Sequence, residues 1–235
     1  MHSNQVELLD YMGSDKSHAL AAWASTYFEL GLDLPKDHKI RIDQIVDHIL
    51  SNSKRMRSIE DLLKFLAENR HSSPLRFSSF MFGMKTEIAT HIQKLKHAVL
   101  LEAENGESAR YKELKEDNFY LPEDWKEYEV GKYWYAKLKH ASIENNNLYH
   151  ECLRDLIESG MPKSRAKESA RFFKMYNSQI HTVNKLSFDG IIQFYYKRAA
   201  KDAQVEIGQI AKNMLSCIKE IEGNPFKYSL KAFNL

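Results

Sequence analysis

One stretch of the chain limits the possible fold more than any other, because its side chains alternate while its surroundings follow helical spacing. Residues 77–84 read Phe-Ser-Ser-Phe-Met-Phe-Gly-Met, which places Phe80, Phe82 and Met84 on one apolar face. A period of two residues is typical of a strand. Further strands are expected at residues 6–9 and 179–184, so the chain should contain a small sheet.

Helical spacing covers most of the remaining chain. Only 5 prolines and 9 glycines interrupt 235 residues, so helices should dominate. Ser14 and Ser58 are in position to cap the helices that follow them. Residues 102–108 are polar and read as a loop. Helices are expected over residues 17–30, 40–50, 58–69, 86–101, 123–139, 143–158, 189–198 and 204–222, with another after Pro162. This pattern predicts an α+β fold, with helices packed around a small central sheet, in a single domain spanning residues 1–235.

Composition excludes several classes of protein. The chain has 34 basic and 32 acidic residues, a formal charge of +2, which argues against a nucleic-acid binder but allows a local basic pocket for one phosphorylated small molecule. No stretch approaches the roughly 18 apolar residues that cross a bilayer, so we expect a cytoplasmic protein without a membrane partner. Cys152 and Cys217 are far apart, which predicts buried reduced thiols and no metal site.

Short motifs occur along the chain in an informative order. The most specific is Ser-Ala-Arg-Tyr at residues 108–111, followed by Phe-Tyr-Leu-Pro-Glu-Asp-Trp at residues 119–125. Residues 6–15, residues 70–74 (Arg-His-Ser-Ser-Pro) and the later His-Thr-Val-Asn at 181–184 complete the set. Taken together over roughly residues 6–215, they resemble the flavin-dependent thymidylate synthases, the ThyX family.

The resemblance implies both a fold and a reaction. The sheet would be mostly antiparallel, and the chain would form a homotetramer with active sites between subunits. Bound FAD would be reduced by NADPH, and a one-carbon unit would pass from methylenetetrahydrofolate to C5 of dUMP, yielding dTMP. The cofactors would carry the difficult chemistry while the protein positions and polarises the substrate.

Arg198 matches the arginine that lies against the uracil ring in that family. Negative charge builds on the ring oxygens when C5 attacks, and a fixed guanidinium stabilises it without reorganising. Arg198 would therefore be both catalytic and substrate-binding. The simpler alternative is a solvated helix arginine beside Lys197 and Lys201.

Ser108 and Arg110 match residues that bind the nucleotide phosphate, and Gln93 matches a further nucleotide contact. A phosphate favours a planar cationic fork together with hydroxyl donors. The alternative for Arg110 is an ordinary ion pair, for which Glu107 and Glu113 are available.

The resemblance also assigns residues to the flavin. His71 would lie at the flavin ring, with Ser73 nearby, and Asn105 and Asn184 would contact FAD. Each residue alone has a structural alternative, since an asparagine in a loop is commonly a turn residue. The complete set expected to bind the cofactor is Ser25, His71, Ser73, Lys96, His97, Asn105, Asn184 and Gln193.

The chain departs from the family pattern mainly on the flavin side. The family motif is Arg-His-Arg, seven residues, then Ser, whereas this chain reads Lys-His-Ala at residues 96–98 with nine residues before Ser108. Trp23, Arg76 and Glu168 also differ from the residues usual at their positions. Arg76 and Lys96 could replace the lost charge in a rebuilt site, or the flavin chemistry could be altered. Two alternatives to thymidylate synthesis therefore stay open: another C5 one-carbon transfer, such as hydroxymethylation, and a non-catalytic nucleotide-binding protein.

Overall fold

The computed structural model describes residues 2–24, 36–52, 57–97 and 100–235. Contacts divide the chain into two compact units, each built from separate stretches of sequence. The first, here called the α6 unit, consists of Met1–Val6, Gly83–His97 and Glu104–Val183. The second, the α8 unit, consists of Glu7–Phe82, Ala98–Ala103 and Asn184–Leu235.

A four-stranded antiparallel sheet confirms the α+β prediction. Its strands are β1 (Gln5–Met12), β2 (Ser79–Glu87), β3 (Ala103–Gly106) and β4 (Gln179–Ser187), in the order β1-β2-β4-β3. The alternation of residues 77–84 is confirmed in β2, where Phe80 and Phe82 are fully buried and Met81 is exposed. Every strand contributes residues to both units.

The prediction of a loop over residues 102–108 is wrong in its centre, where β3 forms. The backbone N–H of Glu102 donates to the carbonyl of Lys185 at 2.8 Å, and that of Glu107 donates to the carbonyl of His181 at 2.8 Å. β3 is an edge strand with mostly exposed side chains. Edge strands need no apolar alternation, and for that reason the sequence pattern did not indicate it.

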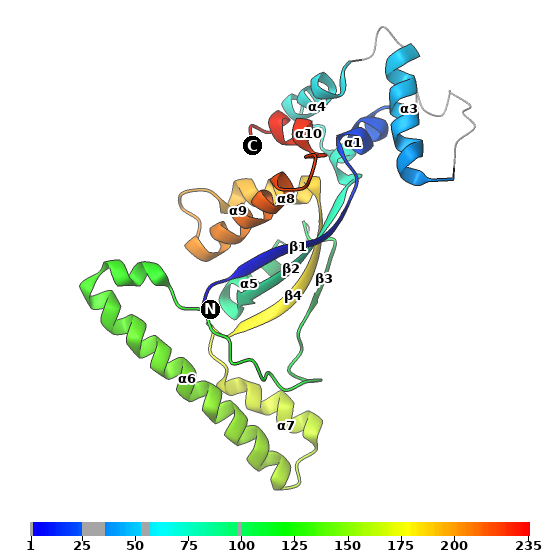
Figure 1. The fold of residues 1–235 in the computed structure, drawn as a ribbon. Coiled ribbons are helices and arrows are strands. Elements are labelled where there is room, and N and C mark those ends of the chain that lie inside the picture. Colours follow the sequence, from blue (N-terminus) through cyan, green and yellow to red (C-terminus); the bar gives the residue numbers. More distant parts are fainter. Residues whose placement is uncertain (1, 25–35, 53–56, 98–99) are drawn as a thin grey trace. The chain divides into compact units, whose positions relative to one another are not determined.

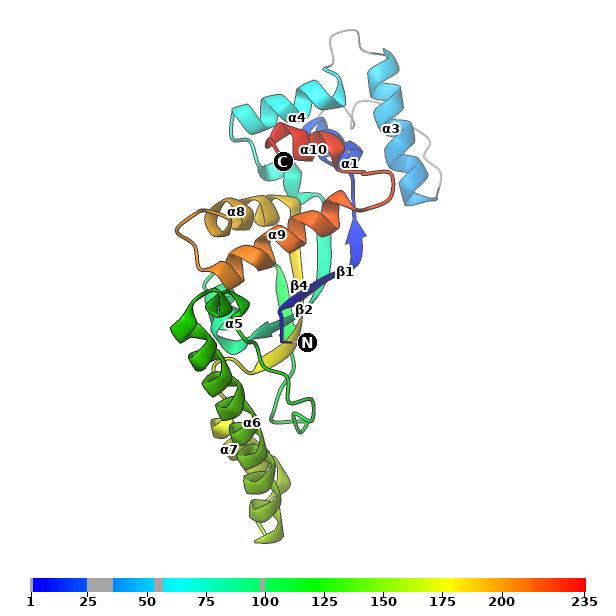
Figure 2. The ribbon, with the colours of Figure 1, turned by 60° about the vertical axis from the view of Figure 1, so that its left-hand side comes forward.

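The α6 unit carries α5 (Ile88–Leu95), η2 (Glu123–Glu127), α6 (Glu129–Glu158), α7 (Lys163–Ala170) and η3 (Arg171–Phe173). The helix predicted over residues 86–101 is shorter, because residues 86–87 end β2 and α5 stops at Leu95. Figures 1 and 2 both show α7 lying alongside α6. Tyr149 and Leu153 of α6 pack there against Ala166 and Ala170 of α7.

Two helices predicted at residues 123–139 and 143–158 are instead one short 3₁₀ turn and one 30-residue helix. The first boundary lies at Tyr128, whose extended backbone separates η2 from α6. The expected break near residue 140 does not occur. Ser142 lies within the helix, where its hydroxyl donates to the carbonyl of Leu138 at 2.8 Å.

The α8 unit contains α1 (Asp15–Ala22), α3 (His38–Asn52), α4 (Ile59–Glu68), η1 (Ser73–Arg76), α8 (Phe188–Arg198), α9 (Val205–Lys219) and α10 (Lys227–Ala232). The two predicted N-caps are confirmed: Ser14 accepts from the N–H of Ser17, and Ser58 from that of Asp61. The rest of the helix predicted over residues 17–30 lies partly outside the described residues.

An aromatic cluster joins the C-terminal helix to the sheet within the α8 unit. The rings of Phe80 and Phe226 lie 4.9 Å apart, and those of Phe188 and Phe226 lie 5.8 Å apart. All three side chains are fully buried. Such packing anchors the segment after residue 225 inside its own chain.

A buried polar relay runs beside this cluster. Asp15 accepts from the backbone N–H groups of Tyr228 and Ser229, at 2.7 and 2.8 Å, and from the Ser229 hydroxyl at 2.5 Å. Because that hydroxyl donates to Asp15, it accepts from Nδ1 of His18 at 2.8 Å. Nε2 of His18 is then the acceptor for the Ser78 hydroxyl, also at 2.8 Å. Burial lowers the pKa of His18 to about 3, so the ring is neutral.

No helix among the described residues is long and apolar enough to span a membrane. Cys152 and Cys217 carry free thiols, and both are half-buried rather than buried as predicted. Burial raises the pKa of the Cys217 thiol.

Candidate active site

The predicted phosphate loop follows directly after β3. The Ser108 carbonyl accepts from the N–H of Tyr111 at 3.2 Å, and its hydroxyl accepts from the N–H of Arg110 at 3.4 Å. This turn leaves the Arg110 side chain exposed. Its Nε lies 2.8 Å from a carboxylate oxygen of Glu168 on α7.

The partner of Arg110 therefore differs from both candidates that the sequence suggested. Glu107 pairs with Lys112, and Glu113 contacts His150 at 2.9 Å. Glu168 is 58 residues from Arg110 in sequence. Only the packing of α7 brings the two side chains together.

Two further cations of α7 lie beside this ion pair. Arg165 Nη1 is 3.6 Å from the second carboxylate oxygen of Glu168. Lys167 Nζ donates to the carbonyl of Tyr111 at 2.9 Å, so it holds the loop that carries Arg110. Lys167 was missed in the sequence analysis, although three basic residues around one glutamate in residues 163–168 form a signal for a basic patch.

A buried ionic cluster links α5 to β3 within the α6 unit. The side chain of Lys94 is 3 % exposed, and its Nζ lies 3.7 Å from Glu104 Oε1 and 3.2 Å from the Thr182 hydroxyl. His91 Nδ1 lies 3.3 Å from the same Glu104 oxygen. Burial lowers the pKa of Lys94, while the Glu104 carboxylate acts against this change. Burial, and then the charge of Lys94, also lower the pKa of His91.

This cluster positions residues that the resemblance assigns to ligands. Asn105 follows Glu104 on β3 and is exposed. Gln93 precedes Lys94 on α5, and its side-chain oxygen is buried without a hydrogen-bond partner among the described residues. Lys96 is exposed and His97 is half-buried just after α5. Ala98 lies outside the described residues.

A second polar network fixes the far side of the phosphate loop. His150 of α6 lies 2.9 Å from Glu113 and 2.9 Å from Asp117. Lys174 joins Asp117 to Asn146 at 2.9 and 2.8 Å, and its Nζ lies 4.4 Å from the centre of the Tyr149 ring. The segment from Arg110 to Asp117 is thus held by charged contacts at both of its ends.

The α8 unit holds the other predicted residues. His71 and Ser73 are exposed on the turn that contains η1. Arg76 Nε, at the end of η1, lies 3.0 Å from Asp189 of α8, and Gln193 donates to the same carboxylate at 2.9 Å. Arg76, which carries the opposite charge to the residue usual at this position in the family, therefore has a counter-ion in Asp189. Gln193 is brought to the same turn, but its amide is engaged by Asp189.

Asn184 and Arg198 lie deeper in the α8 unit. Asn184 of β4 is fully buried. Arg198 ends α8 and is half-buried. A Cβ on Gly208 would lie 2.9 Å from the Arg198 carbonyl oxygen, so this glycine allows α9 to approach the end of α8 closely. Ser25 lies outside the described residues.

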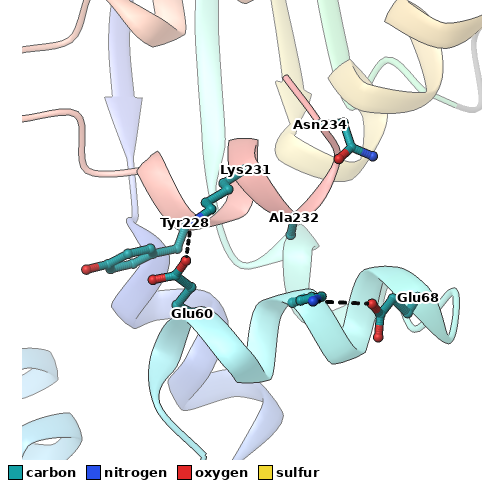
Figure 3. Close-up of a pocket in the computed structure, with 7 residues that line it drawn as sticks. Glu60, Glu68, Tyr228, Lys231, Ala232 and Asn234 are labelled. Atoms are coloured by element: carbon teal, nitrogen blue, oxygen red, sulfur yellow. Dashed lines mark hydrogen bonds and ion pairs between the residues drawn. The ribbon is translucent and has the colours of Figure 1, made fainter.

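A separate pocket of about 290 Å³ in the α8 unit contains none of the predicted residues. Figure 3 shows Lys231 of α10 paired with Glu60 of α4 across it, and Glu68 farther along α4. Glu68 pairs with Lys64. Because its cations are matched by acids, the pocket offers no excess charge for a phosphate. Among the described residues there is also no group of three His, Cys, Asp or Glu side chains arranged to hold a metal ion.

The α+β fold of this chain is shared with solved structures. The solved structure of a UMP/dUMP methylase, PolB from Streptomyces cacaoi, bound with 5-Br UMP, has the same fold, with a TM-score of 0.70 and 20% sequence identity. The match covers 100% of this chain and 95% of that one. A second PolB structure, bound with 5-Br dUMP, gives a TM-score of 0.69 at 22% identity, covering 100% of this chain and 96% of that one.

The sequence then identifies the family. Residues 7–222 match the family described as Thymidylate synthase complementing protein, Thy1, and the chain belongs to that family. The flavin-dependent thymidylate synthase of Thermosipho africanus is 28% identical over 229 residues, covering 92% of this chain and 86% of the relative. That of Thermus thermophilus is 28% identical over 229 residues, covering 92% and 71%. The resemblance found from the motifs is confirmed.

Proposed function

We propose that the chain is a flavin-dependent methyltransferase that methylates C5 of a pyrimidine nucleoside monophosphate, with dUMP as its substrate and methylenetetrahydrofolate as its one-carbon donor. The observation that carries the proposal is the Ser108–Arg110 turn, in which Ser108 is half-buried and the Arg110 side chain is exposed, with Lys167 and Arg165 beside it. It lies inside the stretch matched by the family, and the relatives named above are thymidylate synthases.

The phosphate of the nucleotide would be bound by the guanidinium of Arg110 and the hydroxyl of Ser108. A planar guanidinium can donate two parallel hydrogen bonds to phosphate oxygens, which orients the nucleotide as well as binding it. Arg198 would stabilise the negative charge that develops on the uracil oxygens as C5 attacks. Arg198 is the last residue of α8, where Gly208 of α9 approaches its backbone carbonyl closely.

Several exposed side chains are proposed to bind the flavin. His71 and Ser73 present donors on one turn, and Lys96 and Asn105 add a cation and an amide. The family resemblance assigns each of these four residues to FAD, two in each unit, and Arg76 retains an exposed guanidinium beyond its contact with Asp189. The chemistry that FAD would supply when bound and reduced by NADPH is the hydride that completes the methyl group. Asn184, which is fully buried, and Gln193, whose amide donates to Asp189, are also assigned to FAD by the resemblance.

The test is turnover by purified protein. Protein saturated with FAD should convert dUMP to dTMP when supplied with methylenetetrahydrofolate and NADPH, and an Arg110→Ala variant should raise the KM for dUMP. UMP should be assayed in parallel, because the PolB structures carry both ribo- and deoxyribonucleotide analogues. Mass analysis of the product distinguishes methylation from hydroxymethylation. A folded protein that binds nucleotide but yields no C5-modified product would refute the proposal.

A second candidate is a nucleotide-binding protein that no longer uses FAD. The specific observation in its favour is that Asn184 is fully buried and the Gln193 amide is engaged by Asp189. In this case dUMP should raise the melting temperature whereas FAD should not. The homotetramer remains a prediction, which light scattering on the purified protein tests.

A further inference from the structure

The ion pair at Arg110 has an unusual arrangement for a phosphate-binding residue. One oxygen of Glu168 lies 2.8 Å from Arg110 Nε, and the other lies 3.6 Å from Arg165 Nη1. The carboxylate is therefore held between two guanidinium groups, one on the phosphate loop and one on its own helix. The Arg110 side chain is 56% exposed and that of Glu168 is 27% exposed, so the pair can be reached from solvent.

A carboxylate and a phosphate seek the same donors. Both are bound by the planar fork of a guanidinium, and both carry negative charge. A phosphate dianion at Arg110 would therefore meet the Glu168 carboxylate at close range, where like charges repel. An exposed ion pair of this kind is weak because water screens it, so displacing the carboxylate costs little.

We propose that Glu168 is a displaceable counter-ion that competes with the nucleotide phosphate for Arg110 and thereby selects ligands by their phosphate charge. This inference rests on the proposed function. A phosphate dianion displaces the carboxylate, which turns to Arg165 on the preceding turn of α7. A ligand without a phosphate leaves the Arg110–Glu168 pair intact. Lys167 holds the loop through the Tyr111 carbonyl in either arrangement.

The experiment compares the wild-type chain with Glu168→Gln, which keeps the size of the side chain and removes its charge. Binding of dUMP, UMP and deoxyuridine is measured by calorimetry at several KCl concentrations. We expect dUMP to bind a few-fold more tightly to the variant, with a steeper loss of affinity as salt rises, because the site gains one unit of positive charge. Deoxyuridine should bind equally to both proteins.

Two further variants serve as controls. Glu144→Gln on α6 removes the same charge from a side chain that faces His140, and should leave the affinity for dUMP unchanged. Arg165→Ala removes the alternative partner of the displaced carboxylate, and should weaken dUMP binding a few-fold. Thermal melting establishes that each variant is folded.

The outcomes separate this inference from the proposed function. Wild-type protein that binds dUMP as tightly as Glu168→Gln, or more tightly, overturns the role of Glu168 and leaves the proposed function in place. A gain for deoxyuridine as large as that for dUMP also overturns it, since the effect would not concern the phosphate. If neither folded protein binds dUMP or UMP at millimolar concentration, the proposed function itself fails, and the role of Glu168 fails with it.

Discussion

The two units bury polar side chains in different ways. The α6 unit relies on opposite charges: Lys94, Glu104 and His91 form one cluster beside the phosphate loop. The α8 unit relies on a hydrogen-bonded relay in which His18 is neutral and the Asp15 carboxylate is satisfied by backbone donors. Removing a charge should therefore damage the first unit most, whereas adding a proton should damage the second.

The largest effect is expected from Lys94→Met. The substitution keeps the length of the side chain but leaves the Glu104 carboxylate buried without its cation. Breaking a buried ion pair in this way costs about 3–5 kcal/mol of unfolding free energy. Urea denaturation measures the loss. The double variant with Glu104→Gln should recover part of it, and equal losses in the single and double variants would show that the charge pair is unimportant.

Acid should test the relay of the α8 unit. The folded-state pKa of His18 is about 3, below the value of 6.5 typical of an unfolded chain, so the unfolded state takes up the proton first. This contribution to stability is complete above about pH 6.5 and declines as the pH falls toward 3. At pH 5 the loss relative to pH 7 should be about 2 kcal/mol.

The matched control for that titration is His18→Gln, which can still donate and accept hydrogen bonds. It should remove the His18 part of the dependence between pH 7 and 5, measured by urea denaturation at each pH. An unchanged pH dependence in this variant would place the titrating group elsewhere.

A smaller effect is expected at the turn that contains η1. Arg76→Ala removes the cation from Asp189, but the arginine is exposed and Gln193 still donates to the carboxylate. The loss should be about 1 kcal/mol or less, seen as a slight fall in melting temperature. A much larger loss would mean that the Arg76–Asp189 ion pair is important to the stability of the α8 unit, and that unit would then rely on opposite charges as the α6 unit does.

The smallest effect is expected at a solvated pair of α6. Lys132 and Glu129 lie 2.9 Å apart with most of both side chains exposed. Lys132→Met should change the unfolding free energy by less than about 0.5 kcal/mol. This variant sets the baseline against which a change at Lys94 is judged, and a loss comparable to that of Lys94→Met would erase the distinction between buried and surface charges.

These contrasts also explain what the sequence could predict. Local signals were sufficient for the alternation in β2 and for the N-caps at Ser14 and Ser58, because their causes lie within a few residues. β3 was missed because its strand character comes from pairing with β4, which is distant in the sequence. The single long α6 was missed because the residues near position 140 are polar, as loop residues commonly are. In the structure they lie within the helix, and the Ser142 hydroxyl donates to the carbonyl of Leu138.

The candidate site shows the same contrast between local signals and tertiary contacts. The order of the motifs was enough to predict the family and to select Ser108, Arg110 and Arg198. The partners of those residues were not predictable, because Glu168 reaches Arg110 only through the packing of α7. The complete burial of Asn184 and the engagement of Gln193 likewise depend on tertiary contacts that no local pattern encodes.

Gly208 has a consequence for anyone who engineers this chain. Gly208 is the fourth residue of α9, and a glycine within a helix is a common target for thermostabilisation, since alanine in a helix interior gains about 1 kcal/mol from backbone propensity. In α9 the added methyl group would collide with the main chain at Arg198, at the 2.9 Å approach described above. We expect Gly208→Ala to displace the end of α8, and with it Arg198, the residue on which turnover is proposed to depend.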